Sequence, residues 1–464
     1  MSEDLYATQL AEFITRTRYI DLSQAASHKA LVHTLDTFGA ALAGSTSNEA
    51  KLAQTTFCAA QETGASLCWG TSQRLSARSA ALVNGIAAHA FELDDTGGCD
   101  HSGAVVLPAL MALIPTLEHQ VTGKELLTAI TVGYDIGRRV LESFGGYRPH
   151  NEAGWHSTGT CGVFGAAAAA ANLLQLTTEQ TISCLGLAGS FSSGLWGFVH
   201  DGTMAKKVHA GRAAEGGVLA ALLARGGMTG PRKVFEDVWG GFFNTYGRES
   251  IDRHALVQAL GQDWRIMNCA IKPYASCRDT HAAIDAIDRL VRAHQIMPQE
   301  VKEIHIRLST FLSGMVGGRD VSTLPAAQMS LPYAVSARLC LGQASLQSYS
   351  DENRQSEQLR AMIDRVIIDI DDSVQASFSS DVSIVTSDHR ILKESTSVAL
   401  GAPTNPLTQD ALIEKFMVLA RYVLSDEQSL RLAVTLQSLD TLEDSAHLLR
   451  LLEPTDYSFH TQAI

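Results

Sequence analysis

The sequence predicts a mainly α protein: a large all-helical domain with a smaller α+β lid domain. Up to residue 265, alanine- and glycine-rich stretches carry apolar residues at helical spacing. Beyond that point, segments rich in β-branched residues indicate strands. The length of 464 residues also exceeds one ordinary core. We therefore expect a discontinuous helical domain at residues 1–265 and 405–464, with the α+β domain at 266–404.

The helices of the first domain are expected in chain order. From residue 27 to Gly44, Leu31, Leu35, Phe38 and Leu42 line one face, which predicts an amphipathic helix that stops at the glycine. Four further Ala/Gly-rich stretches are also predicted to be helices, and their small residues would let neighbouring helices approach closely. These stretches are 76–93, 123–144, 162–176 and 211–227.

In the second domain, residues 303–310 and 364–371 alternate or concentrate β-branched residues and are expected to be strands. Residues 382–395 predict two strands around a turn at 387–389, and 279–294 predicts a helix. Pro403 and Pro406 interrupt regular structure before helical spacing resumes at 411–424. The C-terminal helices are therefore expected to return to the first domain.

Composition narrows the function classes. The chain has 36 Lys+Arg against 49 Asp+Glu, a formal net charge of −13, with no basic run that would bind nucleic acid or anionic lipid. The acidic N-terminus does not resemble a signal peptide, and the apolar stretch from Ala104 is too short for a membrane span. Eight scattered cysteines indicate reduced, mostly buried thiols. We expect a cytoplasmic protein without membrane segments or nucleic-acid partners.

Standard motifs for nucleotides, hydride transfer, zinc proteases and serine hydrolases are absent from the sequence. Polar clusters in apolar, glycine-flanked sequence are the remaining candidates. The first holds three acids in four residues, Glu92, Asp94 and Asp95, followed by Asp100 and His101. It is either a solvated, capped helix end or a site where one carboxyl has a raised pKa. The segment also weakly resembles the magnesium-diphosphate motif of terpene cyclases, but the sequence lacks the second motif of that family.

Three more clusters add imidazoles and cations. His156 precedes a helix of small residues, where backbone amides bind anions, although a simple Ser/Thr cap is the alternative. Lys206 and Lys207 stand at a helix start, where their positive charges oppose the helix dipole. They therefore make more sense as ligand contacts than as helix stabilisers, although Lys207 is expected at the surface. Arg278 could clamp a carboxylate, with His281 one turn further on. Singly, each is more often structural, but together they indicate a polyanionic small molecule that undergoes proton transfer.

The ordered motifs NGIAAHAFELDDT, HSGAVVLPA, GWHSTGTCGVFGAAAAAANLLQL, KKVHAGRAAEGG, KPYASCRDTHAAIDA and AQMSLPYAV resemble the MmgE/PrpD family over nearly the full length. That family includes 2-methylcitrate dehydratases, cis-aconitate decarboxylases and iminodisuccinate epimerases. The resemblance implies a helical domain with an inserted α+β lid, a metal-free cleft site without cofactor, and a homodimer. Many relatives carry Asp where this chain has Glu92, which bears on substrate fit.

From the clusters and the resemblance together, we expect a lyase that acts on a di- or tricarboxylate of the 2-methylcitrate, citrate or cis-aconitate class. A proton next to a carboxylate would be moved through a carbanion-like state stabilised by cations. Which residue is acid and which is base stays open, as do an epimerase of an imino- or amino-dicarboxylate and a catalytically silent carboxylate-binding protein. Magnesium at the acidic cluster is not required. The candidate catalytic residues are Asp94, His101, His156, Lys206 and His281, and the candidate substrate-binding residues are Glu92, Thr96, Lys272, Arg278 and Tyr147.

Overall fold

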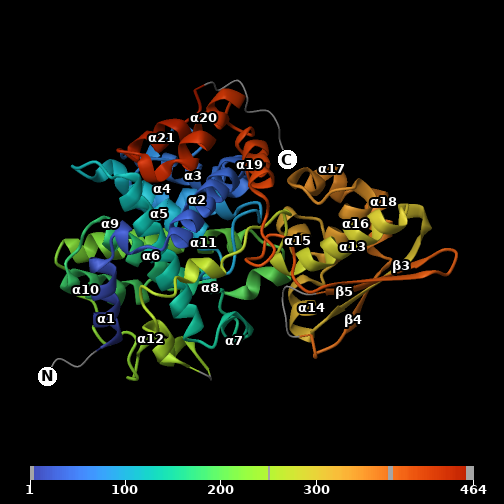
Figure 1. Cartoon of the computed structure of the whole chain (residues 1–464), viewed down its shortest axis with the longest axis horizontal. Coiled ribbons are helices and arrows are strands. Elements are labelled where there is room, and N and C mark those ends of the chain that lie inside the picture. Colours follow the sequence, from blue (N-terminus) through green and yellow to red (C-terminus); the bar gives the residue numbers. More distant parts are fainter. Residues whose placement is uncertain (1–4, 249–250, 375–379, 456–464) are drawn as a thin grey trace.

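The computed structural model describes residues 5–248, 251–374 and 380–455, and it confirms the predicted fold class. A helical domain and an α+β domain lie side by side (Figure 1). The helical part contains α1 (Tyr6–Arg16), α2 (Gln24–Gly44), α3 (Asn48–Ala59), α4 (Ala77–His89), α5 (Gly103–Leu113), α6 (Gly123–Glu142), α7 (Tyr147–Glu152), α8 (Ser157–Thr160), α9 (Gly162–Leu173), α10 (Thr178–Gly189), α11 (Ala205–Arg225), α12 (Phe242–Tyr246), α19 (Gln409–Ala420), α20 (Asp426–Gln437) and α21 (Ala446–Leu452), with a short hairpin of β1 (Ser66–Leu67) and β2 (Arg74–Leu75).

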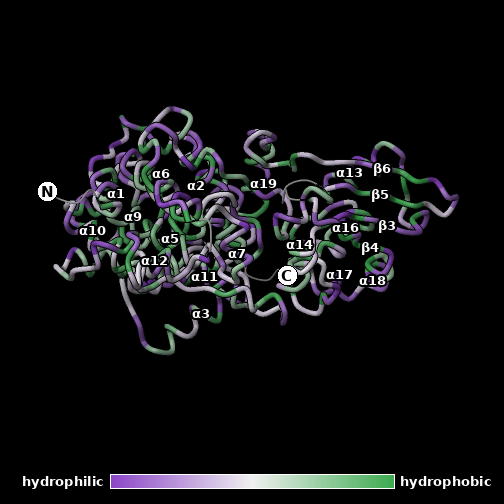
Figure 2. The backbone as a smooth tube through the Cα atoms, turned by 90° about the horizontal axis from the view of Figure 1, so that it is seen from below, coloured by the Kyte–Doolittle hydropathy of each residue, from purple (hydrophilic) through white to green (hydrophobic). Residues whose placement is uncertain are grey.

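Small residues decide how the central helices pack. A Cβ on Gly85 of α4 would lie 2.6 Å from the Cα of Gly211 on α11, so these two helices approach backbone to backbone. Gly217 of α11 meets Ala166 of α9 in the same way. The hydrophobic helix α5 is buried along its whole length in the middle of this domain (Figure 2). The tight packing fixes the N-terminus of α11, where the predicted site residue Lys206 stands next to Lys207.

The helix expected from residue 27 to Gly44 forms three residues earlier, at Gln24. Its amphipathic character was predicted wrongly for the second half, because residues 33–45 are all buried. Helices α4, α5, α6 and α19 pack against α2 and leave no solvent side there. Two of the buried polar residues of this half, His33 and Asp36, anchor other segments, as described below for His33.

The α+β part is built on one four-stranded sheet in the order β4-β3-β5-β6. Strand β3 is parallel to β4, and the other pairs are antiparallel. The predicted turn between the last two strands is confirmed, with His389 in the left-handed region at φ +64°. The elements are α13 (His281–His294), β3 (Val301–Leu308), α14 (Thr310–Val316), α15 (Leu324–Gln328), α16 (Leu331–Leu341), α17 (Asp351–Arg354), α18 (Glu357–Ile363), β4 (Val366–Ile370), β5 (Ser380–Thr386) and β6 (Ile391–Thr396).

One face of the sheet is buried, and burial alternates along β5 as expected for such a sheet. Helix α13 lies across β5 and β6, and α16 packs beside α13 (Figure 1). The C-terminal helix α19 packs on α2, and Leu412 and Phe416 belong to the same core as Phe38. The exact limits of the two domains stay predictions.

The segment after α4 runs along the junction between the two parts. Phe91 and Leu93 pack in one hydrophobic cluster with Tyr333 of α16 and with Tyr349. Thr96 pairs with Ala270 in an isolated β-bridge. The acidic cluster therefore lies where both domains can reach it. In the part of the chain that the structure describes, no helix is both long and apolar enough to cross a bilayer.

Candidate active site

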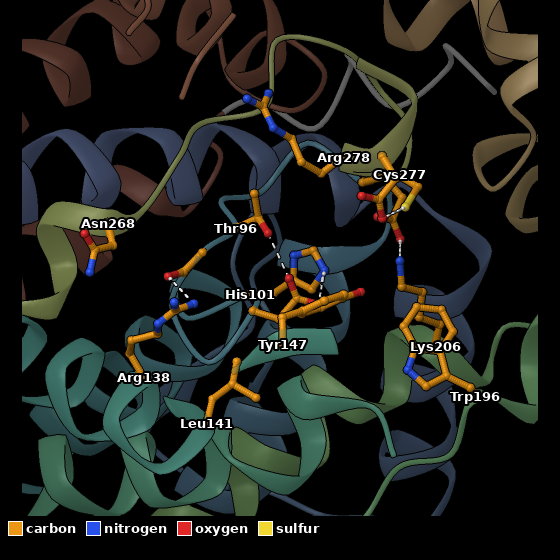
Figure 3. A pocket seen from close by; sticks show the side chains of 14 residues that line it. Thr96, His101, Arg138, Leu141, Tyr147, Trp196, Lys206, Asn268, Cys277 and Arg278 are labelled. Atoms are coloured by element: carbon orange, nitrogen blue, oxygen red, sulfur yellow. Dashed lines mark hydrogen bonds and ion pairs between the residues drawn. The ribbon is translucent and has the colours of Figure 1, made fainter. Parts of the chain in front are cut away.

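A cavity of about 190 Å³ opens at the domain junction and is lined by residues of both parts (Figure 3). Six of the ten predicted site residues contribute to its wall. These six are Glu92, Thr96, His101, Tyr147, Lys206 and Arg278. The other four lie behind the wall, in contact with lining residues or with their direct neighbours. These four are Asp94, His156, Lys272 and His281.

Glu92 is the centre of a lysine cluster. Its Oε1 accepts from the ammonium groups of Lys206 at 2.7 Å and Lys207 at 2.5 Å, and its Oε2 accepts from Lys272 at 3.2 Å. The backbone of Glu92 is in the left-handed region at φ +55°, a strained conformation for a side-chain-bearing residue. Burial opposes the ionised carboxylate, but the lysines outweigh it, and the pKa of Glu92 is well below its usual value.

The three lysines respond differently to the same carboxylate. Burial disfavours all three ammonium groups, but Glu92 outweighs burial at Lys206 and Lys272 and raises their pKa. Asp94 adds to this effect at Lys272. At Lys207 burial wins, and its pKa is lowered. The expectation that Lys207 is exposed was wrong: it is 1% exposed, because the close packing of α11 turns both lysines inward.

Asp94 and His101 form a buried pair. His101 lines the cavity wall, and Asp94 lies directly behind it. The Oδ2 of Asp94 is 3.1 Å from Nδ1 of His101 and 3.0 Å from Nδ1 of His89. Burial opposes both ionised forms. The neighbouring imidazoles and Lys272 hold the pKa of Asp94 well below its usual value, while Asp100 and Asp94 raise the pKa of His101. These carboxylates therefore favour the imidazolium form of His101.

Both interpretations of the acidic cluster were wrong in part. Glu92, Asp94 and Asp95 are all buried, so the cluster is not a solvated helix end. The pKa values of Glu92 and Asp94 are lowered rather than raised, because cations from distant segments surround them. Asp95 has an anchoring position, where its carboxylate contacts His33 Nδ1 at 2.8 Å and accepts from the Tyr134 hydroxyl at 2.6 Å.

Asp100 lines the cavity although it was not selected as a site residue. It sits at φ +106°, accepts from the Thr96 hydroxyl at 2.8 Å, and lies 3.3 Å from Nε2 of His101. His156, fully buried, approaches the same carboxylate with Nε2 at 3.8 Å. Asp100 directly precedes His101 in the acidic motif, and this position was the signal that could have identified it.

His281 contacts the cavity only through Arg278. Its Nε2 lies 3.2 Å from the backbone oxygen of Ser276, a pure acceptor, so Nε2 carries the hydrogen. Its Nδ1 then accepts from Arg278 at 3.2 Å, which agrees with a pKa well below the usual value in this buried place. Arg278 itself donates to the backbone oxygens of Leu400 and Ala399. His281 thus helps to fix the guanidinium of Arg278, one of the residues that line the cavity.

Asp279 is a carboxyl of the cavity wall whose pKa is raised. Burial, followed by the negative charge of Asp100, raises its pKa to about 6. It lines the cavity beside Cys277, whose thiol contacts it at 3.7 Å and has its own pKa raised to about 12 by burial. No sequence signal singled out Asp279, because its environment is supplied by the opposite wall.

The remaining wall includes an aromatic and a basic residue. Tyr147 on α7 lines the cavity, and burial raises the pKa of its phenol well above the usual value. Arg138 on α6 also lines the cavity and pairs with Glu142 at 2.9 Å. Arg138 was missed because it looks like an ordinary surface residue of a long amphipathic helix.

Among the described residues, two trios of side chains have the spacing that could hold a metal ion: His89 with Asp94 and His101, and Asp100 with His101 and His156. Their nitrogen-rich donor set does not suit magnesium, which prefers oxygen ligands. The same atoms already pair with one another as imidazole–carboxylate contacts. The metal-free site stays a prediction.

Comparisons with known proteins agree with this architecture. Residues 8–254 match the MmgE/PrpD N-terminal domain, and residues 274–441 match the MmgE/PrpD C-terminal domain. The chain is 30% identical to the cis-aconitate decarboxylase-like protein oryM of Aspergillus oryzae, with 82% of this chain and 84% of the relative covered. It is 29% identical to a cis-aconitate decarboxylase of Aspergillus terreus, over 84% of both chains. The human cis-aconitate decarboxylase is 27% identical, over 90% of this chain and 88% of the relative.

The two-domain fold, the charged cavity between the domains and these full-length relatives define the class of the protein: it is an enzyme, a lyase. More particularly, the chain belongs to the MmgE/PrpD family, as its sequence motifs predicted.

Proposed function

We propose that the enzyme removes CO₂ from a small unsaturated tricarboxylate of the cis-aconitate type. The observation that carries the proposal is the pairing of His101, an imidazolium between two carboxylates, with the ammonium of Lys206 in the wall of one cavity. Loss of CO₂ needs cations for the carboxylates that remain and one proton donor for the new C–H bond. Both are present here, and the named relatives support the same reaction.

In this scheme, Lys206, Arg278 and Arg138 bind the substrate carboxylates from different elements of the wall. Departure of CO₂ from the saturated arm leaves its electron pair on the adjacent carbon. The pair shifts across the neighbouring double bond toward the carbon that bears another carboxylate. Preorganised cations stabilise the charge that develops there.

His101 is proposed to complete the reaction as the general acid, by donating its Nε2 proton to that carbon. One proton enters and one CO₂ leaves, so the trianion becomes a dianionic product. Asp94 acts through His101, because its carboxylate at 3.1 Å holds the ring and stabilises the imidazolium. Glu92 acts through Lys206, whose position and charge it fixes.

Proton NMR in D₂O tests the reaction directly. With cis-aconitate, we expect CO₂ release and one deuterium in the new methylene group of itaconate. The expected control is that His101→Asn abolishes turnover, whereas His119→Asn, an exposed histidine far from the cavity, does not. Conversion of 2-methylcitrate or citrate to an alkene would instead establish a dehydratase. Deuterium at a stereocentre of an otherwise unchanged acid would establish an epimerase.

We further propose, from the family resemblance, that the chain works as a homodimer, and from the sequence that it works in the cytoplasm. Sedimentation equilibrium of the purified protein tests the first point, with a mass of twice 49.8 kDa expected.

A further inference from the structure

Two histidines lie in line behind the cavity wall and take no part in the scheme above. His156 stands at the start of α8, and His209 lies in the second turn of α11. Their Nδ1 atoms are 2.9 Å apart. His156 is completely buried, whereas His209 is partly exposed. The pair therefore connects the cavity side of the helical domain with its outside.

The hydrogen bonds of the pair depend on the groups at its inner end. Nε2 of His156 lies 3.4 Å from the Thr158 hydroxyl and 3.8 Å from the Asp100 carboxylate, which only accepts. We place the hydrogen of His156 on Nε2, where the hydroxyl can accept it and the carboxylate attracts it. As a neutral imidazole it then accepts on Nδ1, so Nδ1 of His209 must donate. The hydrogens point from His209 through His156 toward the cavity.

The surroundings keep both rings neutral and in place. Burial, followed by the nearby His209 and Lys206, holds the pKa of His156 well below its usual value. Burial and Lys206 lower the pKa of His209 to about 4. The Trp196 ring lies edge-on to His156 at 5.2 Å and shields it. The other titratable groups that face His156 are His101 and His89.

A glycine loop holds the two rings together. Gly194 has φ +123°, and its backbone oxygen accepts from the His156 amide at 3.1 Å. A Cβ on Gly194 would lie 3.2 Å from Cγ of His209 and 3.3 Å from its Nδ1. A larger residue here would press on the His209 ring. The chain thus leaves room for an imidazole pair at this place.

We propose that His209 and His156 form a proton relay that returns a solvent proton to the cavity after each turnover. This inference rests on the proposed function, because decarboxylation consumes one proton per product. After His101 has given up its Nε2 proton, Asp100, 3.3 Å away, passes on a proton that it takes from Nε2 of His156. His156 takes the Nδ1 proton of His209 in exchange, and His209 takes one from water. Each ring gains a proton on one nitrogen as it loses one from the other, and both rings return to their starting tautomers before the next turnover.

The variant His209→Asn separates relay from positioning, because its amide N–H can replace the Nδ1 donor but cannot pass a proton on. We expect the first turnover, followed by rapid quench with enzyme in excess, to keep its rate, since His101 starts protonated. Steady-state kcat should fall about 10²-fold, the low end of the usual range for a proton-transfer group. Added imidazole should restore part of it. The matched control is His294→Asn, an exposed histidine at the end of α13, which should behave as wild type.

Two results would overturn the relay. A His209→Asn enzyme with unchanged steady-state kcat would show that protons enter another way. A first turnover that slows as much as the steady state, without rescue by imidazole, would show that His209 is only structural. Thermal unfolding of each variant checks that the fold is retained.

A second measurement does not depend on the reaction. In ¹⁵N-histidine NMR of the wild type, we expect His156 in the Nε2–H form, assigned by its loss in His156→Gln, and the same form in His209→Asn. Loss of this preference in His209→Ala is expected as well. If His156 instead carries its hydrogen on Nδ1, the relay is wrong. If cis-aconitate stays inert while the Nε2–H form is found, the proposed function fails and the hydrogen-bond chain stands.

Discussion

Two segments face each other across the cavity and treat their carboxyl groups in opposite ways. In the loop from Glu92 to His101, on the helical side, each acid is surrounded by lysines or imidazoles, and the pKa values of Glu92 and Asp94 are lowered. In the segment from Cys277 to His281, at the α+β side, the pKa of Asp279 is raised to about 6. The first segment provides fixed charge, and the second provides a group that changes protonation near neutral pH.

The pKa of a carboxyl here is set by the groups that the fold places around it, not by its neighbours in the sequence. Both segments are buried, so desolvation acts on all these acids in the same direction. At Glu92, the ammonium groups of Lys206 and Lys272 outweigh desolvation and lower the pKa. At Asp279 the nearest strong influence is another acid, Asp100, which adds to it.

The largest effect is expected from removing the charge at the centre of the loop. Glu92→Gln leaves three buried ammonium groups without their shared carboxylate, and loss of one partner of a buried ion pair costs about 3–5 kcal/mol. Urea unfolding at pH 7 measures this. Glu118→Gln, an exposed glutamate, is the control and should change little. A loss below about 1 kcal/mol would contradict the view that Glu92 holds the lysines.

Next in size is the contrast between neighbouring lysines. Lys206 and Lys207 both contact Glu92 Oε1, but of the two only Lys206 lines the cavity of about 190 Å³. Lys206→Met should lower kcat/KM for cis-aconitate about 10²- to 10³-fold, the usual effect of removing one charge-stabilising donor. Lys207→Met should lower it less than about tenfold. Equal losses in steady-state assays would show that Lys206 acts only through the ion-pair cluster.

The pH dependence of stability tests the opposite wall. Asp279 has a folded-state pKa of about 6, above its unfolded value of 3.8, so ionisation destabilises the fold as pH rises between these values. Asp279→Asn should therefore gain stability over wild type through this window, by at most about 3 kcal/mol above pH 6. Below pH 4 the two should coincide. Denaturation curves from pH 4 to 8 measure the gap, and a gap that shrinks with rising pH would reverse the assignment.

The smallest effect sharpens the comparison within the loop. Thr96→Val removes the hydroxyl that donates to Asp100 at 2.8 Å while keeping the side-chain shape. A hydrogen bond to a charged group contributes about 1.5–3 kcal/mol, and the two neighbouring imidazoles compensate in part, so we expect a loss near ~1.5 kcal/mol. Thermal unfolding measures it, with Thr435→Val on an exposed helix face for comparison. No loss would mean that the histidines alone hold Asp100.

Much of the fold and of the site could be predicted from the sequence. The central helices and the β5–β6 hairpin follow from spacing and turn residues, which act over a few positions. The thiols, all within the described residues, are free and mostly buried, as expected. Clusters such as Glu92 with Asp94, or Lys206 with Lys207, could be recognised because their members are close in sequence. Arg138 and Asp279 could not, since nothing near them in the chain marks them.

Which segments become helices or strands, which helices can touch through glycine and alanine, and the family all follow from the order of the residues. What each charged group does depends on the folded arrangement. Glu92 lies 114 positions from Lys206 and 180 from Lys272, yet these contacts set the direction of its pKa. The physical reason is range: backbone preferences act between near neighbours, whereas burial and Coulomb interactions depend on distance in space. The same acidic residues would have ordinary pKa values in the unfolded chain.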